Sequence, residues 1–348
     1  MNKKIEGIII PIIAVFIALL IGAGIISYLG ENPVKAYYYL FSGAFSNEKA
    51  IARTLLEATP MIFTGLAVLF AFKSGMFNIG AQGQMVVAGL TAAAIGAFIP
   101  NPIINNPLVI MTAAALAGLV WAAIAGVLKA RLGVHEVIST IMLNYIAINV
   151  ELYALNYPLK EGGINGPNPQ TPAVFESARL MHLLPSTNEA LNFGFIIALV
   201  AVVVVWFVFE KTVFGYEIKA VGNNITVSEN AGINVKRIMA LSLGISGALA
   251  GLAGAERVLG GVGQFTYKQG LIASLGFDGI SVALLGKNNP FGALLAAILF
   301  AALRVGGRAM QFNTTVPSQI VIMIQAIIIL LIAAENMFRI VIKKKKGA

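Results

Sequence analysis

The sequence predicts an all-α, polytopic membrane protein with about ten transmembrane helices. Of its 348 residues, 58% are hydrophobic and only 11% are charged, and the mean hydropathy is +0.85. Soluble domains carry about a quarter charged residues, so this chain has too few charges to cover a soluble core. The 36 glycines favour the same class, because small residues let helices approach closely in a bilayer.

The net charge of +9 fits a membrane protein without a nucleic-acid partner. Basic residues flank transmembrane spans and fix their orientation, so we expect membrane lipid around this chain and no nucleic acid. The sequence has no cysteine, which excludes disulfides, thiolate metal sites and a cysteine nucleophile.

The spans can be placed in order, because a transmembrane helix needs about 20 mostly apolar residues. Ten stretches fit or nearly fit: 8–29, 55–72, 84–99, 108–128, 137–155, 193–209, 238–259, 271–285, 291–307 and 320–340. The third and eighth are short for a full crossing. The first resembles a signal peptide, but it is long for one and lacks a clear cleavage site, so we expect it to be retained.

An even number of spans places both termini on one side of the membrane. If that side is the cytoplasm, 15 of the 24 lysines and arginines fall inside and 9 outside, including four consecutive lysines at 343–346 inside. This bias has the sign expected for cytoplasmic termini. We therefore predict one multi-pass domain over 1–348 with both termini in the cytoplasm.

Two polar connections interrupt the series of spans. The proline-rich segment 156–192 has no long apolar run and is predicted to be an extracytoplasmic loop. The segment 210–237 is then the longest cytoplasmic one, and 225–232 within it has the length of two helical turns lying parallel to the membrane. A simple connector would be shorter.

Short motifs indicate an internal repeat of spans 2–5 in spans 7–10. Gly-Ala-Gln-Gly at 80–83 corresponds to Gly-Phe-Asp-Gly at 276–279, and Asn-Pro at 106–107 corresponds to Asn-Pro at 289–290. The matched spans are five apart, which is an odd number, so the two copies must cross in opposite directions. Inverted repeats of this kind occur in many transporters.

Polar residues inside these glycine-interrupted segments are the candidates for a solute pathway. Asp278 is the most informative, because a carboxylate near the bilayer centre costs roughly 2.5–3.5 kcal/mol unless it faces protein or water. Broken segments at matching places in two halves indicate a solute route. The predicted pathway residues are Phe77, Asn78, Gln82, Gln84, Asn144, Phe277, Asp278 and Ser281. The alternative is structural: the polar groups cap half-helices and bond the neighbouring backbone, and the phenylalanines pack.

Arg304 and Arg308 lie on one face of the ninth span, near its outer end. Acidic groups on an external partner are one expected contact for them. Extension of both side chains to the membrane surface is the other.

Catalytic chemistry finds little support in the sequence. Segment 281–288 lacks the first glycine of a phosphate-binding loop and has Asn288 where a magnesium-binding hydroxyl belongs. The two histidines lack metalloprotease spacing, and no nucleophile motif is present. We expect no catalytic residue, no metal site and no cofactor bound by this chain.

Four stretches resemble the permeases of ABC importers in the branched-chain amino acid, simple sugar and nucleoside group. They are Phe-Asn-Ile-Gly-Ala-Gln-Gly-Gln-Met at 77–85, Glu-Val-Ile-Ser-Thr-Ile-Met-Leu-Asn-Tyr at 136–145, 220–233, and 289–311 with its Asn-Pro-Phe-Gly start. The resemblance covers about 32–338 in family order and is nearest to the nucleoside branch.

The resemblance implies a permease in the bacterial plasma membrane that works beside a second, related permease. It also implies cytoplasmic ATPase subunits, which hold the ATP and Mg²⁺, and an extracytoplasmic solute-binding lipoprotein. In such importers a short cytoplasmic helix docks into the ATPase. The matching residues here are Gly215, Glu217, Ala220, Val221, Gly222, Asn223, Ala231 and Gly232.

The resemblance points to nucleosides, purine nucleosides in particular, moved by alternating access between two states. Simple sugars and branched-chain amino acids are the near alternatives. An ATP-independent secondary transporter would show the same repeats, whereas an intramembrane enzyme would need a catalytic constellation that the sequence lacks.

Overall fold

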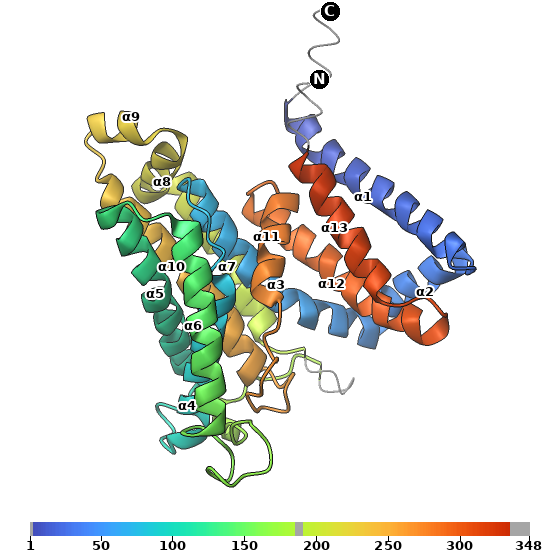
Figure 1. Ribbon diagram of the computed structural model, residues 1–348, viewed down its shortest axis with the longest axis horizontal. Helices are drawn as coiled ribbons and strands as arrows, with labels where there is room; N and C mark the ends of the chain where they lie inside the picture. Colours follow the sequence, from blue (N-terminus) through green and yellow to red (C-terminus); the bar gives the residue numbers. More distant parts are fainter. Residues whose placement is uncertain (1–2, 185–190, 335–348) are drawn as a thin grey trace, which may run out of the picture.

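The protein is all-helical, as the composition predicts. The computed structural model describes residues 3–184 and 191–334 (Figure 1). The α-helices in these residues are α1 (Lys3–Tyr28), α2 (Pro33–Phe45), α3 (Glu48–Lys73), α4 (Ala81–Phe98), α5 (Pro107–Leu132), α6 (Glu136–Asn156), α7 (Gly194–Lys211), α8 (Val213–Asn223), α9 (Ile225–Asn230), α10 (Val235–Leu259), α11 (Leu275–Leu285), α12 (Pro290–Asn313) and α13 (Gln319–Ala333). A single 3₁₀ turn, Glu176–Ala178, lies in the loop after α6.

Each of the ten predicted spans corresponds to one helix. In the described residues eight helices are long and apolar enough to cross a membrane, whereas α11 and α13 are shorter apolar helices. The predicted end of the tenth span, and lysines 343–346, lie outside the described residues. The all-α polytopic prediction is confirmed.

The structure changes the predicted lengths of the third and eighth spans and adds a helix. The third span is not short: α4 begins three residues earlier than predicted and has 18 residues, about 27 Å. The eighth is shorter than predicted, because α11 begins only at Leu275 and has 11 residues, about 16 Å. Helix α2 was not predicted, because its 13 residues are too few to register as a span.

Asparagine–proline pairs explain where three helices begin. Asn32, Asn106 and Asn289 each accept a backbone N–H of the first turn with their side-chain oxygen, and each is followed by proline. An asparagine cap satisfies an otherwise unpaired N–H, and proline at the first helical position loses no hydrogen bond. The two Asn-Pro motifs that suggested the repeat therefore mark equivalent helix starts, those of α5 and α12.

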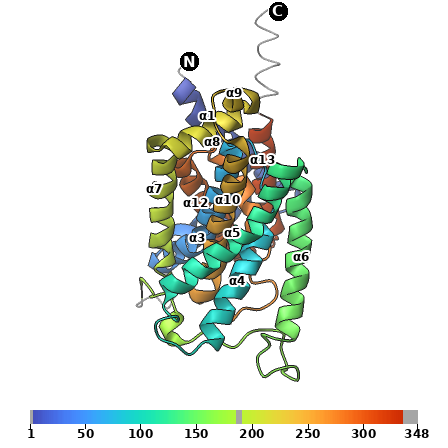
Figure 2. The same cartoon turned by 90° about the vertical axis from the view of Figure 1, so that its left-hand side faces the viewer.

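In the two repeats, α3–α6 and α10–α13, the first helix of each packs on helices of the other. Helix α10 packs on α4 and α5, helix α3 packs on α11 and α12, and α3 and α10 contact each other. The chain follows α3 toward the side that carries α8 and returns along α10 (Figures 1 and 2). The two leading helices therefore run in opposite directions, as an inverted repeat requires.

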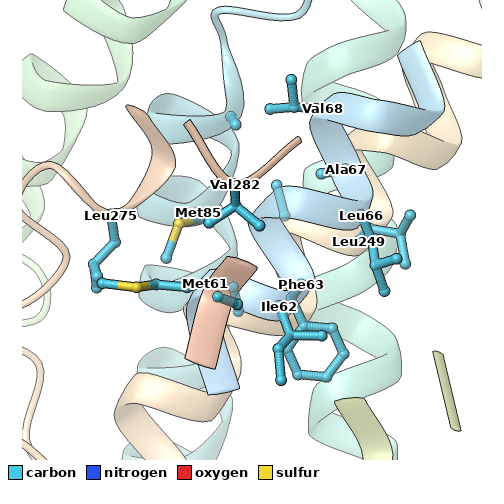
Figure 3. Packing of buried hydrophobic residues seen from close by; sticks show 14 of the residues in the cluster. Met61, Ile62, Phe63, Leu66, Ala67, Val68, Met85, Leu249, Leu275 and Val282 are labelled. Carbon is cyan, nitrogen blue, oxygen red and sulfur yellow. The ribbon is translucent and has the colours of Figure 1, made fainter. Parts of the chain in front are cut away.

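The centre of the molecule is helix α3, which is buried along most of its length. Figure 3 shows its apolar side chains meeting those of α4, α10 and α11, among them Met61, Phe63, Met85, Leu249 and Val282. Glycine permits these approaches: a Cβ on Gly65 would collide with Val282, and one on Gly118 in α5 would collide with the carbonyl of Gly247 in α10. Small residues at helix crossings are typical of membrane bundles.

The two sides of the bundle differ. The start of α1, the end of α13, and helices α8 and α9 lie on one side, and the loops 99–106, 157–184 and 260–274 lie on the other (Figure 1). Backbone bonds join two of these loops: Thr171 N–H donates to the carbonyl of Tyr267 at 2.9 Å, and Val174 N–H donates to that of Phe265 at 2.9 Å. The loop after α6 thereby fixes the segment that leads into α11.

A pH-dependent contact joins the corner between α1 and α2 to the corner between α12 and α13. Glu31 accepts hydrogen bonds from the backbone N–H of Thr315 at 3.0 Å and from its hydroxyl at 2.8 Å. These bonds, the backbone one first, hold the pKa of the Glu31 carboxyl below its ordinary value of 4.5. Because the folded pKa is lowered, the carboxylate contributes stability above its unfolded pKa and loses it as the pH falls through the folded pKa.

We expect Glu31→Gln to lower the melting temperature at about pH 7 and to have a smaller effect below about pH 4. Melting curves of both proteins across this range test it, and an equal difference at every pH would contradict it.

Candidate functional site

The two broken helices meet at their N-termini. Helix α4 follows a non-helical segment, 74–80, and α11 follows the loop 260–274 from the opposite side. Gln82, in the first turn of α4, accepts the N–H of Gly276 at 3.0 Å and donates to the carbonyl of Ile272 at 3.2 Å. One side chain thus satisfies a free N–H at the start of α11 and holds the loop before it. The two glycine motifs that the repeat pairs are in direct contact.

Amide side chains hold the segment that leads into α4. Asn78 donates to Gln84 at 2.9 Å and to the hydroxyl of Ser246 in α10 at 2.7 Å, and its oxygen accepts the N–H of Gly80 at 2.8 Å. Asn144 in α6 accepts the N–H of Gly83 at 2.8 Å and donates to the carbonyl of Ile79 at 2.9 Å. Asn78, Gln84 and Asn144 are buried, with this hydrogen bonding made inside the protein.

Ion pairs link α3, α10, α11 and α12. Glu57 in α3 pairs with Arg257 in α10 at 2.8 Å and with Arg308 in α12 at 3.4 Å. Asp278 in α11 pairs with Arg304 in α12. Both α12 arginines thus pair with carboxylates of the same chain, because α3 and α11 pack directly on α12. The expected surface position does not hold for Arg304, which is 23% exposed, whereas Arg308 is 61% exposed beside its pair.

A cavity of about 140 Å³ lies between α3, α11, α12 and α13. Asp278, Ser281, Arg304 and Gln325 supply its polar wall, and the remaining wall is apolar. The side chains of Asp278 and Arg304 are 26% and 23% exposed. A charged pair that is neither buried nor fully solvated would be costly against lipid, so this wall requires water, solute or another subunit.

The eight predicted pathway residues thus fall into three groups. Asn78, Gln82, Gln84 and Asn144 hold the broken helices together, whereas Asp278 and Ser281 line the cavity. Phe77 packs on Phe72, with ring centroids 4.8 Å apart, and Phe277 is 44% exposed.

Sequence reasoning missed Glu57, Arg257 and Gln325. Each is a polar or charged residue within one of the predicted apolar spans, and that position was the available signal. Nothing in the linear sequence pairs Glu57 with Arg257, because 200 residues separate them.

The segment 210–237 folds into two short helices. Thr212 caps α8 and Asn224 caps α9, which accounts for the break between them. Val221 is buried, and a Cβ on Gly222 would lie 3.0 Å from the backbone of Gly75 and closer still to the carbonyl of Lys73. These two residues therefore seat α8 on the end of α3.

The remaining candidate coupling residues divide by exposure. Gly215 packs on the backbone at the end of α7, and Glu217 and Ala220 are half-buried. Asn223, Ala231 and Gly232 are exposed, as are the α9 side chains Ile225 and Val227 at 45% and 62%. Exposed apolar side chains beside a firmly packed helix such as α8 are typical of a surface that binds another protein.

The family model for the permease component of branched-chain amino acid transport systems matches residues 50–333. The chain belongs to this permease family. The match includes both broken helices, the ion pairs of α3, α10, α11 and α12, and the α8–α9 segment. The permease is therefore a multi-pass membrane protein of an ABC transport system.

Full-length relatives of the permease have named solutes. The chain is 41% identical to the guanosine ABC transporter permease protein NupP of Bacillus subtilis over all of both chains. It is 36% identical to the nucleoside ABC transporter permease protein NupB of Lactococcus lactis, over all of this chain and 96% of that one. The glucose ABC transporter permease protein TsgB13 of Haloferax volcanii is 31% identical, over 94% and 88% of the two chains.

The first two organisms each contain a second, more distant match to the permease. These matches are 25% identical in B. subtilis and 26% in L. lactis, over 81% and 85% of this chain. No solved structure gives a significant match.

Proposed function

We propose that this chain is the transmembrane subunit of an ATP-driven importer that moves nucleosides into the cell by alternating access. The observation that carries the proposal is the 41% identity to a guanosine permease along the whole of both chains. A nucleoside is neutral and offers a flat ring and hydroxyl groups. The exposed Phe277 ring suits the former, and the polar wall of Asp278, Ser281 and Arg304 suits the latter.

The proposed assembly contains a second permease, cytoplasmic ATPase subunits and an extracytoplasmic solute-binding lipoprotein. The presence of two matching permeases in each of two organisms supports a pair of related permeases. ATP and Mg²⁺ are assigned to the ATPase subunits, and this chain is assigned no catalytic step. The α8–α9 segment, with Ile225 and Val227 exposed, is the proposed docking site for an ATPase.

The proposed orientation follows from that docking site. If α8 and α9 face the cytoplasm, the start of α1 and the end of α13 face it too, and the loop 157–184 faces the opposite side (Figure 1). The excess of lysine and arginine expected on the cytoplasmic side supports this orientation in a bacterial plasma membrane.

Solute uptake tests the function directly. Cells with and without this gene are given labelled guanosine, glucose or leucine, and the series is repeated with the partner ATPase inactivated. We expect only guanosine uptake to be lost, and to be lost in both cases. Loss of glucose uptake instead would favour the sugar function that the TsgB13 relative suggests. Uptake that survives ATPase inactivation would contradict an ABC importer.

Asp278→Asn is the sharpest test of the proposed route. The amide removes the charge that pairs with Arg304 and replaces one of the two carboxylate oxygens by an NH₂ donor. Hydrogen bonds to charged groups contribute about 1.5–3 kcal/mol, so we expect uptake to fall about tenfold or more at an unchanged amount of inserted protein. Glu48→Gln removes an exposed carboxylate at the start of α3 and should leave uptake unchanged. Normal uptake kinetics in Asp278→Asn would assign Asp278 a purely structural role.

A further inference from the structure

A second cavity, of about 290 Å³, lies at the ends of α3, α7 and α12 on the side that carries α8 and α9. Its lining includes the last residues of two spans, Lys73 of α3 and Lys211 of α7, and the first residue of a third, Pro290 of α12. Trp206, which faces it from α7, is half-buried. Lysine and tryptophan at span ends mark the depth of lipid headgroups. The cavity therefore lies at the membrane–water boundary.

The charge of this cavity is positive. Lys73 and Lys211 line it, and its single carboxylate, Glu210, is bound by Lys219 of α8 at 3.3 Å. Three lysines against one glutamate leave an excess of positive charge next to a low-dielectric interior. Basic pockets between transmembrane helices are suited to anionic lipid headgroups.

An exposed apolar strip continues from the cavity toward the membrane interior. Phe291 contacts Trp206, with ring centroids 6.1 Å apart, and is 45% exposed. Leu295, one turn further along α12, is 69% exposed, and Val203, one turn before Trp206 on α7, is 51% exposed. Figure 2 shows α7 at the edge of the bundle, where such a strip is accessible. Phe291 lies at the start of α12, whereas Leu295 and Val203 lie about 7 Å and about 12 Å deeper than the span ends Pro290 and Lys211, which is the depth of acyl chains.

We propose that this cavity binds the headgroup of an anionic phospholipid, with phosphatidylglycerol as the best chemical match. The phosphate lies between Lys73 and Lys211, and an acyl chain covers Val203, Phe291 and Leu295. Phosphatidylethanolamine and phosphatidylcholine carry no net negative charge, and each would bring a cationic group against the lysines. The site is next to α8, so bound lipid would also support the helix proposed to contact the ATPase.

The test uses the full-length chain purified in neutral detergent. Mixed micelles contain phosphatidylglycerol or phosphatidylcholine, and a third sample contains inorganic phosphate without added lipid. Melting curves report stabilisation, and native mass spectrometry counts retained lipid. We expect phosphatidylglycerol alone to raise the melting temperature and to remain bound. Equal stabilisation by phosphatidylcholine, or by inorganic phosphate alone, would overturn the proposal.

Charge variants locate the site. Each lysine near a membrane surface contributes about 1 kcal/mol, so Lys73→Gln/Lys211→Gln should weaken phosphatidylglycerol binding about 30-fold. Lys236→Gln/Arg237→Gln removes the same charge from exposed positions at the start of α10 and should leave binding unchanged. Lys211→Glu reverses one exposed charge without disturbing the core and should also weaken binding. Equal binding by Lys211→Glu and the α10 control would place the lipid elsewhere and overturn the proposal.

Discussion

Arg257→Leu is expected to abolish most of the folded permease, and removing Glu57 as well is expected to restore much of it. The two side chains pair at 2.8 Å and are only 5% and 9% exposed. Without Arg257, the Glu57 carboxylate is left in the helix core with weaker cationic partners on α12, the largely exposed Arg308 at 3.4 Å and Arg304. An unpaired buried charge costs about 3–5 kcal/mol, whereas replacing both members of a buried pair by apolar residues is often nearly neutral.

Size-exclusion profiles of detergent-solubilised protein after heating measure this effect. The order of stability should be wild type, then Glu57→Leu/Arg257→Leu, then Arg257→Leu. Arg308→Gln is the matched control, because the Arg308 side chain is 61% exposed and an exposed pair contributes about 0–1 kcal/mol. A double variant less stable than Arg257→Leu would contradict the expectation that the unpaired Glu57 carboxylate causes the loss of stability.

Gly276→Val is expected to reduce both folded yield and uptake to near background. A Cβ at position 276 would overlap the backbone of Ala81 and Gln82, where the two broken helices meet. Backbone atoms on both sides cannot rotate away as a side chain can, so the overlap must separate α11 from α4. Overpacking commonly costs about 1–3 kcal/mol even where side chains yield, and this position offers less relief.

A glycine with free space supplies the control for that variant. In α1, a Cβ on Gly24 would meet nothing within 4 Å, so Gly24→Val should leave yield and uptake unchanged. Yield and labelled-guanosine uptake are measured together for both variants. Wild-type values for Gly276→Val would mean that α11 does not begin against α4 during transport.

Local signals in the sequence predicted a large part of the fold. Apolar length placed all ten spans, because the thickness of the bilayer fixes the length of a crossing helix. The Asn-Pro pairs marked the starts of α5 and α12, because capping depends on adjacent residues. The segment 225–232 was expected to be helical, and α9 occupies Ile225–Asn230. The pathway residues stay a prediction, although the structure gives side-chain hydrogen bonds within the protein to five of them: Asn78, Gln82, Gln84, Asn144 and Asp278.

Long-range contacts decided the remainder. The apolar stretch from position 271 was expected to be helical, yet helix α11 begins only after Ser274, which has a left-handed φ of 62°. The bonds of this loop to Thr171, Val174 and Gln82 hold it out of the helix. None of these partners is near in sequence, so no local pattern predicts them.

By itself the sequence determined the membrane class, the number and order of the spans and the family, since these depend on composition, apolar length and contiguous motifs. Only the tertiary structure decided that Gln82 bonds Gly276, that Asp278 and Glu57 pair with arginines of α12 and α10, and that a cavity forms beside Asp278. The physical reason is that a polar group within a bilayer must find a partner. Which partner it finds depends on helices that the chain brings together from up to 251 residues away.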